Sequence, residues 1–593
     1  MSAAQARKVP LGAAEVEARR RADGSILLRS PYPLDPYPGK ITERLVHWAR
    51  VAPERPFIAQ RDARGAWRSL DYAESLARVR AIGQALIDRG LSQERPVAIL
   101  SDNDIEHALL ALACMHVGVA YFPVSSAYSL VSTDFAKLRF VMGLLTPGLV
   151  YATDGGRFAK AIAAAVPAGT EFIGGDRFTE LEATPATAAV EQAHAATGPD
   201  TIAKFLLTSG STGQPKAVIN TQRMLCSNQQ MLAQSLPSLR AAPPVLVDWL
   251  PWNHTAGSNH NLGIVLYHGG TLYIDEGKPV PGLIEKTVRN LREIGPTIYF
   301  NVPRGYEALL PYLRDDATLR KTFFSRLGLL QYAAAVLPQP IWKAYEDLAI
   351  EACGERILWI TGYGATETAP AAMFTNRGAA RAGTVGLPVD GIEMKLTPVA
   401  DKLEARFRGP SITPGYWRQP DLTKTAFDEE GFYCTGDAMR LADADDPAQG
   451  MEFDGRITED FKLTTGTWVS VGPLRAKINS ACSPLVQDVV ITGHDRDRLG
   501  ALVFLNVAAC RDLSAAVLRE RLQAAFDRLA SNSTGSSTRI ARALVMETPP
   551  SIDASEITDK GSINQRAVLK NRASLVEQLY AELAGPAIIV SST

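Results

Sequence analysis

Residues 206–216, LLTSGSTGQPK, carry the strongest local signal in the chain. Ser, Thr and Gly fill positions 208–213 without interruption, and apolar residues flank the run on both sides. Glycines let backbone N–H groups crowd around an anion, hydroxyls add donors, and Lys216 supplies a compact positive charge. The run is not a Walker A loop, because Lys216 is followed by Ala217 rather than by Ser or Thr. It predicts a polyphosphate-binding loop between two strands.

Around this loop the sequence alternates between short apolar runs and helical patterns. RPVAIL (95–100) precedes a helix-like stretch at 104–117, and PGLVYA (147–152) precedes a helical pattern at 157–166. This alternation, which extends over about residues 41–300, predicts an α/β architecture with largely parallel sheets.

The ends of the chain have a different texture. Residues 1–40 are rich in Pro and Arg, so we expect them to wrap the surface rather than build core. Short strands punctuated by Gly and Pro between about 380 and 456 predict a small β-barrel-like unit. Two apolar segments (488–495 and 499–507) then precede an amphipathic helical pattern at 515–530. This order predicts a small α+β domain from about residue 461 onward.

Size and composition narrow the function classes. A chain of 593 residues is well beyond the roughly 250–300 at which one hydrophobic core stops growing, so we expect at least two domains. Lys and Arg (62) balance Asp and Glu (63), which argues against a nucleic-acid binder. The six cysteines form no C-x-x-C pair, which disfavours a zinc site or a disulfide framework. With no secretory-type start and no long apolar run, we expect a cytoplasmic protein without a membrane span.

The run at 206–216 resembles the phosphate loop of the adenylate-forming superfamily, which includes acyl-CoA synthetases, luciferases and peptide-synthetase adenylation domains. The family pattern is T-S-G-S/T-T-G-x-P-K-G, with Ala217 here in place of the last glycine. Further family motifs follow in the expected order: PWNHTAG (251–257), GYGATET (362–368), YCTGD (433–437) and DGR (454–456).

The resemblance covers about residues 41–570 and implies a two-domain enzyme. We expect a large α/β N-terminal domain, built of parallel sheets and the barrel-like unit, and a smaller mobile α+β C-terminal domain. The implied boundaries are an extension at 1–40, the large domain at 41–455, a hinge at 456–460 and the small domain at 461–593.

Roles for individual residues also follow from the resemblance. ATP phosphates are assigned to Lys216 and to Thr208, Ser209, Gly210, Ser211, Thr212 and Gly213. Tyr363 and Gly364 would lie at the adenine, as would Ala334, whose segment YAAAVL (332–337) replaces a glycine-rich family run. Thr366 would touch the α-phosphate. Glu367 and Thr208 would hold Mg²⁺, for which a carboxylate is a natural ligand beside phosphates. Asp437 and Arg456 would bind ribose, since an ionised Asp can accept hydrogen bonds from both ribose hydroxyls.

The acyl side and the small domain complete the implied site. His254 would lie beside the acyl carboxylate. Lys560 would bridge that carboxylate and the α-phosphate, although it stands two residues earlier than the lysine of the family motif. Lys462, Gly466 and Trp468 would act with coenzyme A in the second half-reaction. A rotation about a hinge near Thr458 would exchange Lys560 for this second loop.

Two phrases narrow the family branch. FKLTTGTWVSVGPLR (461–475) and EITDKGSINQR (556–566) resemble the feruloyl-CoA synthetases, which activate 4-hydroxycinnamic acids such as ferulate. The implied activity is ATP-dependent ligation of such an acid to coenzyme A. Another aryl or medium-chain acid stays open, and so does a stand-alone adenylation enzyme that loads a carrier protein. A non-catalytic relic is disfavoured because the motif residues are all present. The sequence leaves open whether the protein forms a homodimer.

Overall fold

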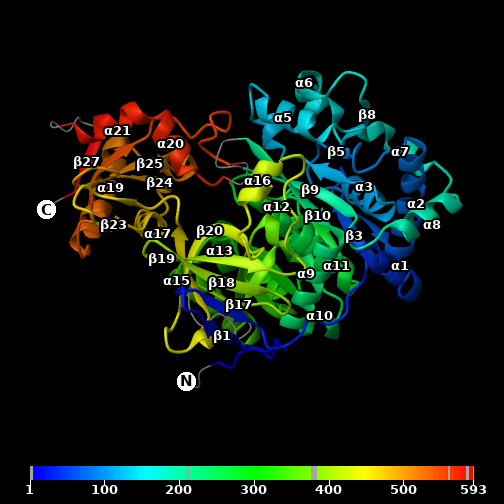
Figure 1. Ribbon diagram of the computed structural model, residues 1–593, viewed down its shortest axis with the longest axis horizontal. Helices are drawn as coiled ribbons and strands as arrows, with labels where there is room; N and C mark the ends of the chain where they lie inside the picture. The colour runs from blue at the N-terminus through cyan, green and yellow to red at the C-terminus, as the bar shows by residue number, and fades with distance from the viewer. Residues whose placement is uncertain (1–3, 210–213, 376–382, 559–560, 582–586, 592–593) are drawn as a thin grey trace.

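The computed structural model describes residues 4–209, 214–375, 383–558, 561–581 and 587–591. Figure 1 shows two lobes: the C-terminal elements, orange to red, form a smaller lobe beside a large one. Separate buried clusters of apolar side chains lie within residues 461–589, distinct from those of the large lobe. The predicted fold class, a large α/β domain with a smaller C-terminal α+β domain, is confirmed.

One sheet of the large domain carries the strands that flank the phosphate loop. Its strand order is β10-β9-β6-β5-β7-β8, and β6, β5, β7 and β8 are parallel. The strands are β10 (Pro215–Thr221), β9 (Ile202–Ser209), β6 (Tyr121–Pro123), β5 (Val97–Ile99), β7 (Leu149–Ala152) and β8 (Glu171–Gly174). The helical patterns predicted after β5 and β7 are α3 (Ile105–His116) and α6 (Gly155–Ala165). The α3 N-terminus is fixed by the Asp104 carboxylate, which accepts from the His107 N–H at 2.6 Å.

A second sheet packs its apolar residues into the same core. Its order is β11-β12-β3-β4, formed by β11 (Val245–Asp248), β12 (Thr271–Ile274), β3 (Pro56–Arg61) and β4 (Trp67–Asp71). The helices that contribute to this core are α1 (Thr42–Val51), α2 (Tyr72–Asp88), α3, α9 (Gln222–Ser235), the π-helix η2 (Ala256–Leu262) and α11 (Gly263–His268). Short helices surround these elements: α4 (Ala127–Leu130), α5 (Ala136–Leu145), α7 (Phe178–Glu182), α8 (Ala188–Ala196), α10 (Ser238–Ala241) and α12 (Ile284–Glu293).

The largest sheet joins a parallel part to an antiparallel one. The parallel strands are β13 (Ile298–Asn301), β14 (Leu329–Tyr332) and β15 (Leu358–Gly364), and they pack on α13 (Pro303–Asp315), α14 (Ala317–Phe324) and α15 (Gln339–Cys353). The antiparallel strands include β16 (Ala371–Phe374), β17 (Thr384–Pro388), β18 (Glu393–Val399), β19 (Lys402–Arg408), β20 (Tyr433–Leu441) and β21 (Met451–Arg456). The short strands predicted at 380–456 thus continue the sheet that carries the GYGATET motif.

The expectation that residues 1–40 build no core is wrong. β1 (Glu17–Arg20) and β2 (Ile26–Arg29) form a hairpin, and β2 pairs with β18 at the edge of the largest sheet. Ile26 and Leu28 are buried in the main core. The local signal is the alternation of Ile26 and Leu28 after an Asp23-Gly24 turn, in which Gly24 has φ +81°.

In the described residues, the small domain contains a four-stranded sheet with the strand order β24-β25-β26-β27. These strands are β24 (Val486–Thr492), β25 (Leu499–Leu505), β26 (Ile540–Val545) and β27 (Ile588–Val590). They pack with α17 (Val471–Ala481), the predicted amphipathic helix α19 (Ala515–Ser531), α20 (Gln565–Asn571) and α21 (Ala573–Tyr580). A hairpin of β22 (Phe461–Lys462) and β23 (Trp468–Val469) precedes them. Among the described residues, no helix combines the length and apolarity needed to cross a membrane.

Candidate active site

The phosphate-loop residues lie at the ends of two paired strands. Lys216 of β10 stands opposite Thr208 of β9 in the antiparallel register, and Ser209 ends β9. Gly210, Ser211, Thr212 and Gly213 lie outside the described residues. The register therefore fixes the two ends of the loop, with the Lys216 amine on the strand that leaves it.

Tyr416 links Lys216 to the GYGATET motif. Lys216 Nζ lies 4.8 Å from the centroid of the Tyr416 ring, and the Tyr416 hydroxyl donates to Glu367 Oε1 at 3.1 Å. The backbone holds Tyr416 there, because its segment bonds along the outer edge of β10, with Trp417 N–H donating to Ala217 O at 2.9 Å. Sequence reasoning did not single out Tyr416, whose only signal is its place in the PGYW run.

Glu367 and Thr366 sit in a short 3₁₀ turn, η3 (Thr366–Thr368), directly after β15. Both residues are buried. The turn needs Gly364, because a Cβ there would lie 1.7 Å from the carbonyl oxygen of Pro370. The chain therefore doubles back closely at Gly364 and brings the Glu367 carboxylate to the β10 edge.

Asp437, in the middle of β20, contacts residues at the ends of two other strands, β15 and β21. The Tyr363 hydroxyl of β15 donates to Asp437 Oδ2 at 2.6 Å, and Arg456 Nε at the end of β21 lies 3.4 Å from Asp437 Oδ1. Burial raises the pKa of the Asp437 carboxyl, with the Arg456 charge opposing that rise. Oδ1 is buried without a hydrogen-bond partner among the described residues. It is thus an acceptor that a bound hydroxyl group could satisfy.

Tyr433 brings these two groups of residues together. It interacts electrostatically with Glu367, Tyr416 and Tyr363, and the Tyr416 hydroxyl donates to Glu367. Burial raises the pKa of Tyr433, and the negative charge of Glu367 raises it further. Three of the predicted motifs, centred on Lys216, Glu367 and Asp437, therefore converge on one place in the large domain.

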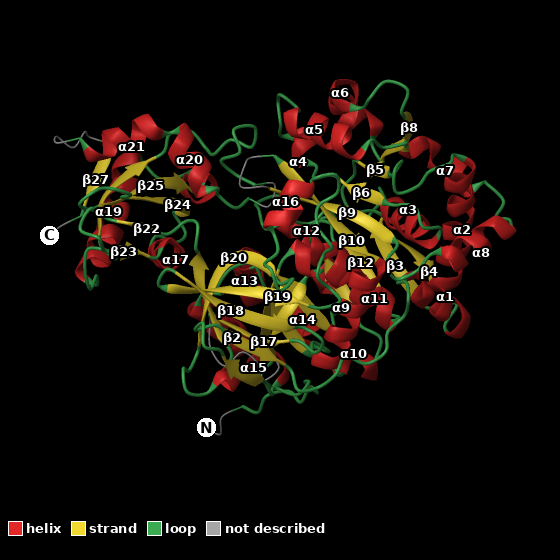
Figure 2. Cartoon of the chain, in the orientation of Figure 1, coloured by secondary structure: helices red, strands yellow, loops and turns green. Residues whose placement is uncertain are grey.

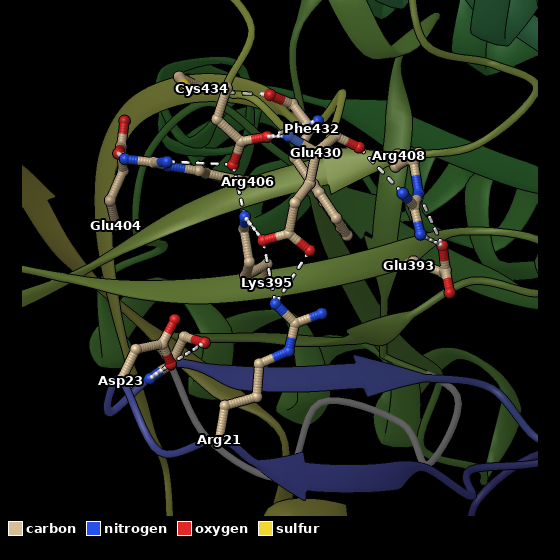
Figure 3. Close-up of polar contacts among 12 residues, drawn as sticks. Arg21, Asp23, Glu393, Lys395, Glu404, Arg406, Arg408, Glu430, Phe432 and Cys434 are labelled. Atoms are coloured by element: carbon tan, nitrogen blue, oxygen red, sulfur yellow. Dashed lines mark hydrogen bonds and ion pairs between the residues drawn. The ribbon is translucent and has the colours of Figure 1, made fainter.

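An ion network, buried at its Glu404 end and partly exposed at Glu430 and Arg21, supports the part of β20 that carries Asp437. Glu404 Oε1 accepts from the Gly436 N–H at 3.0 Å, and Glu404 Oε2 pairs with Arg406 at 2.7 Å. From Arg406 the contacts continue through Asp428 and Lys395 to Glu430, which pairs with Arg21 of the N-terminal hairpin (Figure 3). We call this set the Glu404–Arg21 network. Sequence reasoning missed Glu404, because only pairing of β19 with β20 brings it to the YCTGD motif.

His254 and Ala334 lie on segments that follow strands of two different sheets. His254 follows β11, and its carbonyl oxygen accepts from Ser258 Oγ at 2.9 Å at the start of η2. Long π-helices are rare and often mark functional sites. Ala334 follows β14 and is exposed, with φ +73°, a left-handed backbone that favours glycine.

The small-domain residues fall into two places. Lys462 and Trp468 face each other across the β22–β23 hairpin, with Lys462 Nζ 4.9 Å from the Trp468 ring centroid and Gly466 at φ +80° in the turn. In Figure 2 this hairpin lies on the small lobe, apart from β9 and β10. The structure therefore does not bring it to Lys216 and Glu367.

Lys560 itself lies outside the described residues, but its flanks lie against the large domain. Thr558 and Gly561 form a tight turn, with Gly561 N–H donating to Thr558 O at 3.0 Å. Ile552 and Ile557, just before the turn, pack in the cluster that contains Phe205 of β9. Residues 552–557, which precede Lys560 in the sequence, thus lie against the large domain.

Comparison with known proteins gives consistent matches over both lobes. Residues 45–417 match the AMP-binding enzyme family, and residues 459–584 match the AMP-binding enzyme C-terminal domain. Malonate–CoA ligase of Arabidopsis thaliana is 30% identical over 259 residues, 41% of this chain and 41% of that protein. The chain thus spans less than half the length of curated relatives such as this one.

Two further matches cover more of the chain. Feruloyl-CoA synthase of Amycolatopsis sp is 27% identical over 415 residues, which is 67% of this chain and 75% of that protein. The crystal structure of an anthranilate CoA ligase in complex with anthranoyl-AMP superposes with a TM-score of 0.71. It is 20% identical, and the match covers 92% of this chain and 99% of that one, so it supports the fold.

Proposed function

Because the chain belongs to the AMP-binding enzyme family of the adenylate-forming superfamily, we propose that it is an ATP-dependent acid–CoA ligase. The reaction joins a carboxylic acid to AMP with loss of pyrophosphate, and coenzyme A then displaces AMP. The observation that carries the proposal is the convergence of Lys216, Glu367 and Asp437, with a buried Asp437 oxygen left without a hydrogen bond.

The nucleoside is assigned to the Tyr363–Asp437–Arg456 group. The free Oδ1 of Asp437 accepts a ribose hydroxyl, and Arg456 supplies a second polar contact at the same edge. Tyr363 offers a rigid ring for the adenine, whose other side faces the Ala334 segment. This arrangement leaves the phosphates pointing toward Glu367 and Lys216.

In the first half-reaction a carboxylate oxygen attacks the α-phosphorus of ATP. An O–P bond forms to the acid, and the bond to pyrophosphate breaks, which replaces an oxide leaving group by AMP. Lys216 and the donors of residues 208–213 stabilise the phosphate charge, and Thr366 contacts the α-phosphate. His254 lies at the acid, and Lys560 holds the two anions together.

Magnesium fits the residues at this place. Glu367 and the Thr208 hydroxyl would hold the ion, which supplies charge neutralisation on the phosphate oxygens when bound. Mg²⁺ usually takes one or two carboxylates and completes its shell with water and phosphate.

In the second half-reaction the thiol of coenzyme A attacks the acyl carbonyl. A C–S bond forms, and the C–O bond to AMP breaks. We assign Lys462, Gly466 and Trp468 to this step, which requires the small domain (461–593) to rotate about the segment 456–460.

For the acid, we propose ferulate or a related 4-hydroxycinnamate. Support comes from the two sequence phrases at 461–475 and 556–566 and from the match to feruloyl-CoA synthase. The chain is also similar to a malonate–CoA ligase and an anthranilate–CoA ligase. The alternative is therefore that the substrate is a different aryl or medium-chain acid. Transfer to a carrier protein is the second alternative.

A panel of acids tests both levels of the proposal. AMP formation is measured with ATP, coenzyme A and each acid, and again with coenzyme A omitted. We expect kcat/KM for ferulate and p-coumarate to exceed that for hexanoate and benzoate by at least about tenfold, or ~1.4 kcal/mol of transition-state discrimination. Equal rates on hexanoate would rule out the cinnamate assignment alone. Acid-dependent AMP formation that does not respond to coenzyme A would rule out the ligase and favour a carrier protein.

A further inference from the structure

A cavity lined by both polar and apolar residues lies at the far end of the helix that starts near His254. η2 (Ala256–Leu262) continues directly into α11 (Gly263–His268), and the last two residues of α11 line a cavity of about 370 Å³. The cavity is closed from the other side by α1, α10 and residues 36–38 of the N-terminal extension. In Figure 1, α1, α10 and α11 lie on the side of the large domain away from the small lobe.

Two guanidinium groups converge on this cavity. Arg44 comes from α1 and Arg240 from α10, and both line it. Their charges act on the same buried side chains of α11. The pKa of His268 is lowered to about 3, chiefly by burial and in smaller part by the charges of both arginines. Burial raises the pKa of Tyr267 to about 12 against the opposing effect of the same two charges.

Neither arginine has a close carboxylate partner in the described part of the chain. Arg44 donates through Nε to the Tyr267 carbonyl at 2.8 Å, which caps the end of α11, and no ion pair to Arg44 occurs there. Burial lowers the pKa of Arg44, as expected for a partly desolvated cation. Arg240 has only Asp35, at 3.7 Å, and both of those side chains are about half exposed. Such a pair contributes little and leaves Arg240 free to turn.

We propose that this cavity is a binding site for a small oxyanion, the carboxylate or phosphate head group of a small molecule held between Arg44 and Arg240. Guanidinium groups bind such head groups through paired N–H donors. Pro36, Tyr37 and Pro38 offer an apolar wall for the body of the molecule. The volume falls within the range of about 300–1,000 Å³ usual for small-molecule sites. The site takes no part in the proposed ligase reaction.

Titration calorimetry of the full chain with 4-bromobenzoate and, separately, with inorganic phosphate tests the site. We expect R44Q and R240Q each to weaken one binding event by about tenfold, the usual effect of one lost charge-assisted hydrogen bond. R50Q is the matched control, because Arg50 is an exposed arginine on the same helix α1. R50Q should bind both probes as the wild type does. Binding at the adenylation site is common to all these proteins and cancels in the comparison.

Each outcome bears on the site. Equal arginine-dependent affinity for both probes supports recognition of the head group, and tighter binding of 4-bromobenzoate supports a contribution from the apolar wall. Binding of both probes that is unchanged in R44Q and R240Q overturns the site. Arg240 is exposed, so R240Q gives a result even if R44Q fails to fold. Arginine-dependent binding in a protein without ligase activity would still support the site, which keeps the two proposals separate.

Discussion

Glu367 is the only carboxylate that the described structure places against Lys216 through a shared neighbour, the Tyr416 ring. Its side chain is buried, and one oxygen is held by the Tyr416 hydroxyl at 3.1 Å. The other oxygen is therefore the one that can reach a metal ion at the phosphates. In this way a buried hydrogen bond orients a charge that the proposed reaction needs.

Replacement of Glu367 by Gln separates that charge from the hydrogen bond. Gln can still accept a hydrogen bond from Tyr416, so the turn keeps its shape. The negative charge that would bind Mg²⁺ is lost. We expect AMP formation to fall by about 10²-fold or more, with partial recovery at high magnesium concentration. Y416F is the matched variant: it removes the hydrogen bond and keeps the charge, and should cost far less. Wild-type turnover of E367Q at low magnesium would show that Glu367 does not hold the metal.

Ala334 gives a second prediction at single-residue scale. Its φ of +73° is unfavourable for a residue with a Cβ, and its family counterpart is a glycine-rich run. Ala334→Gly should raise the free energy of unfolding by up to about 1 kcal/mol, because relief of backbone strain exceeds the added chain entropy. Ala335→Gly is the control, since Ala335 does not have a positive φ and should lose about 0.4–1 kcal/mol. Urea unfolding of the two variants measures both free energies. If A334G loses as much free energy of unfolding as A335G does, the backbone at Ala334 is not strained.

At the scale of elements, the part of β20 that carries Asp437 is held by a contact from outside its own motif. Glu404 of β19 bonds the Gly436 N–H, one residue before Asp437, and is itself fixed by Arg406 and the rest of the Glu404–Arg21 network. Thr435 adds a bond to Ala405 O at 2.6 Å. The N-terminal hairpin thus reaches the proposed ribose site through a continuous series of ion pairs.

Glu404→Gln should therefore loosen nucleotide binding. The neutral amide cannot both accept from the Gly436 N–H and form an ion pair with Arg406. The part of β20 that carries Asp437 therefore loses one of the contacts that hold it. We expect KM for ATP to rise about threefold to tenfold, the size of one net hydrogen bond, with kcat changed less than about twofold. Glu393→Gln removes an exposed pair with Arg408 on the same sheet and should have no measurable effect. Steady-state kinetics with varied ATP distinguish the two variants. Equal KM values for ATP in both variants would show that Glu404 does not help to position Asp437.

Local pattern was sufficient to predict many elements, and distant pairing explains most of what it missed. The runs at 95–100 and 147–152 became β5 and β7, and the pattern at 515–530 became α19, because their periodicity lies within one segment. Tyr416 and Glu404 reach the site only through pairing with strands far away in the sequence. The β1–β2 hairpin was missed because its four-residue strands sit in a Pro- and Arg-rich context. The phosphate loop and Lys560 lie outside the described residues, so their assignments stay predictions.

At the scale of the whole molecule, the described residues show contacts of the small domain and of the hinge with the large domain. The Asp553 carboxylate accepts from the Thr133 N–H and hydroxyl at 2.9 and 2.8 Å, and Lys137 Nζ donates to Ile552 O at 2.6 Å. Within the proposed hinge, Asp460 pairs with Lys402 of the large domain at 2.5 Å, with both side chains almost fully buried. The contacts of Ile552 and Asp553 hold these two residues against α5 and the segment before it, and we propose that this docked arrangement serves the first half-reaction.

Lys560 and Asp553 therefore allow one joint prediction about this arrangement. Lys560→Ala removes the cation proposed to join the acid and the α-phosphate, so adenylate formation from acid and ATP should fall by roughly 10²-fold or more. Asp553→Ala only weakens docking and should slow the same step about tenfold, as expected for a lost charge-assisted bond. Neither change should slow thioester formation from pre-formed acyl-AMP and coenzyme A, because that step uses the rotated domain.

Single-turnover assays of the two half-reactions measure these effects separately. Asp497→Ala is the control for Asp553→Ala, since Asp497 is an exposed small-domain carboxylate that pairs only with its neighbour Arg498. It should leave both steps unchanged. If Lys560→Ala impairs both steps equally, the lysine acts on folding rather than on one reaction, and normal adenylation would assign the role to another residue. If Asp553→Ala slows thioester formation more than adenylation, the docked arrangement serves the second step, and the order of the two domain positions is the reverse of the one proposed.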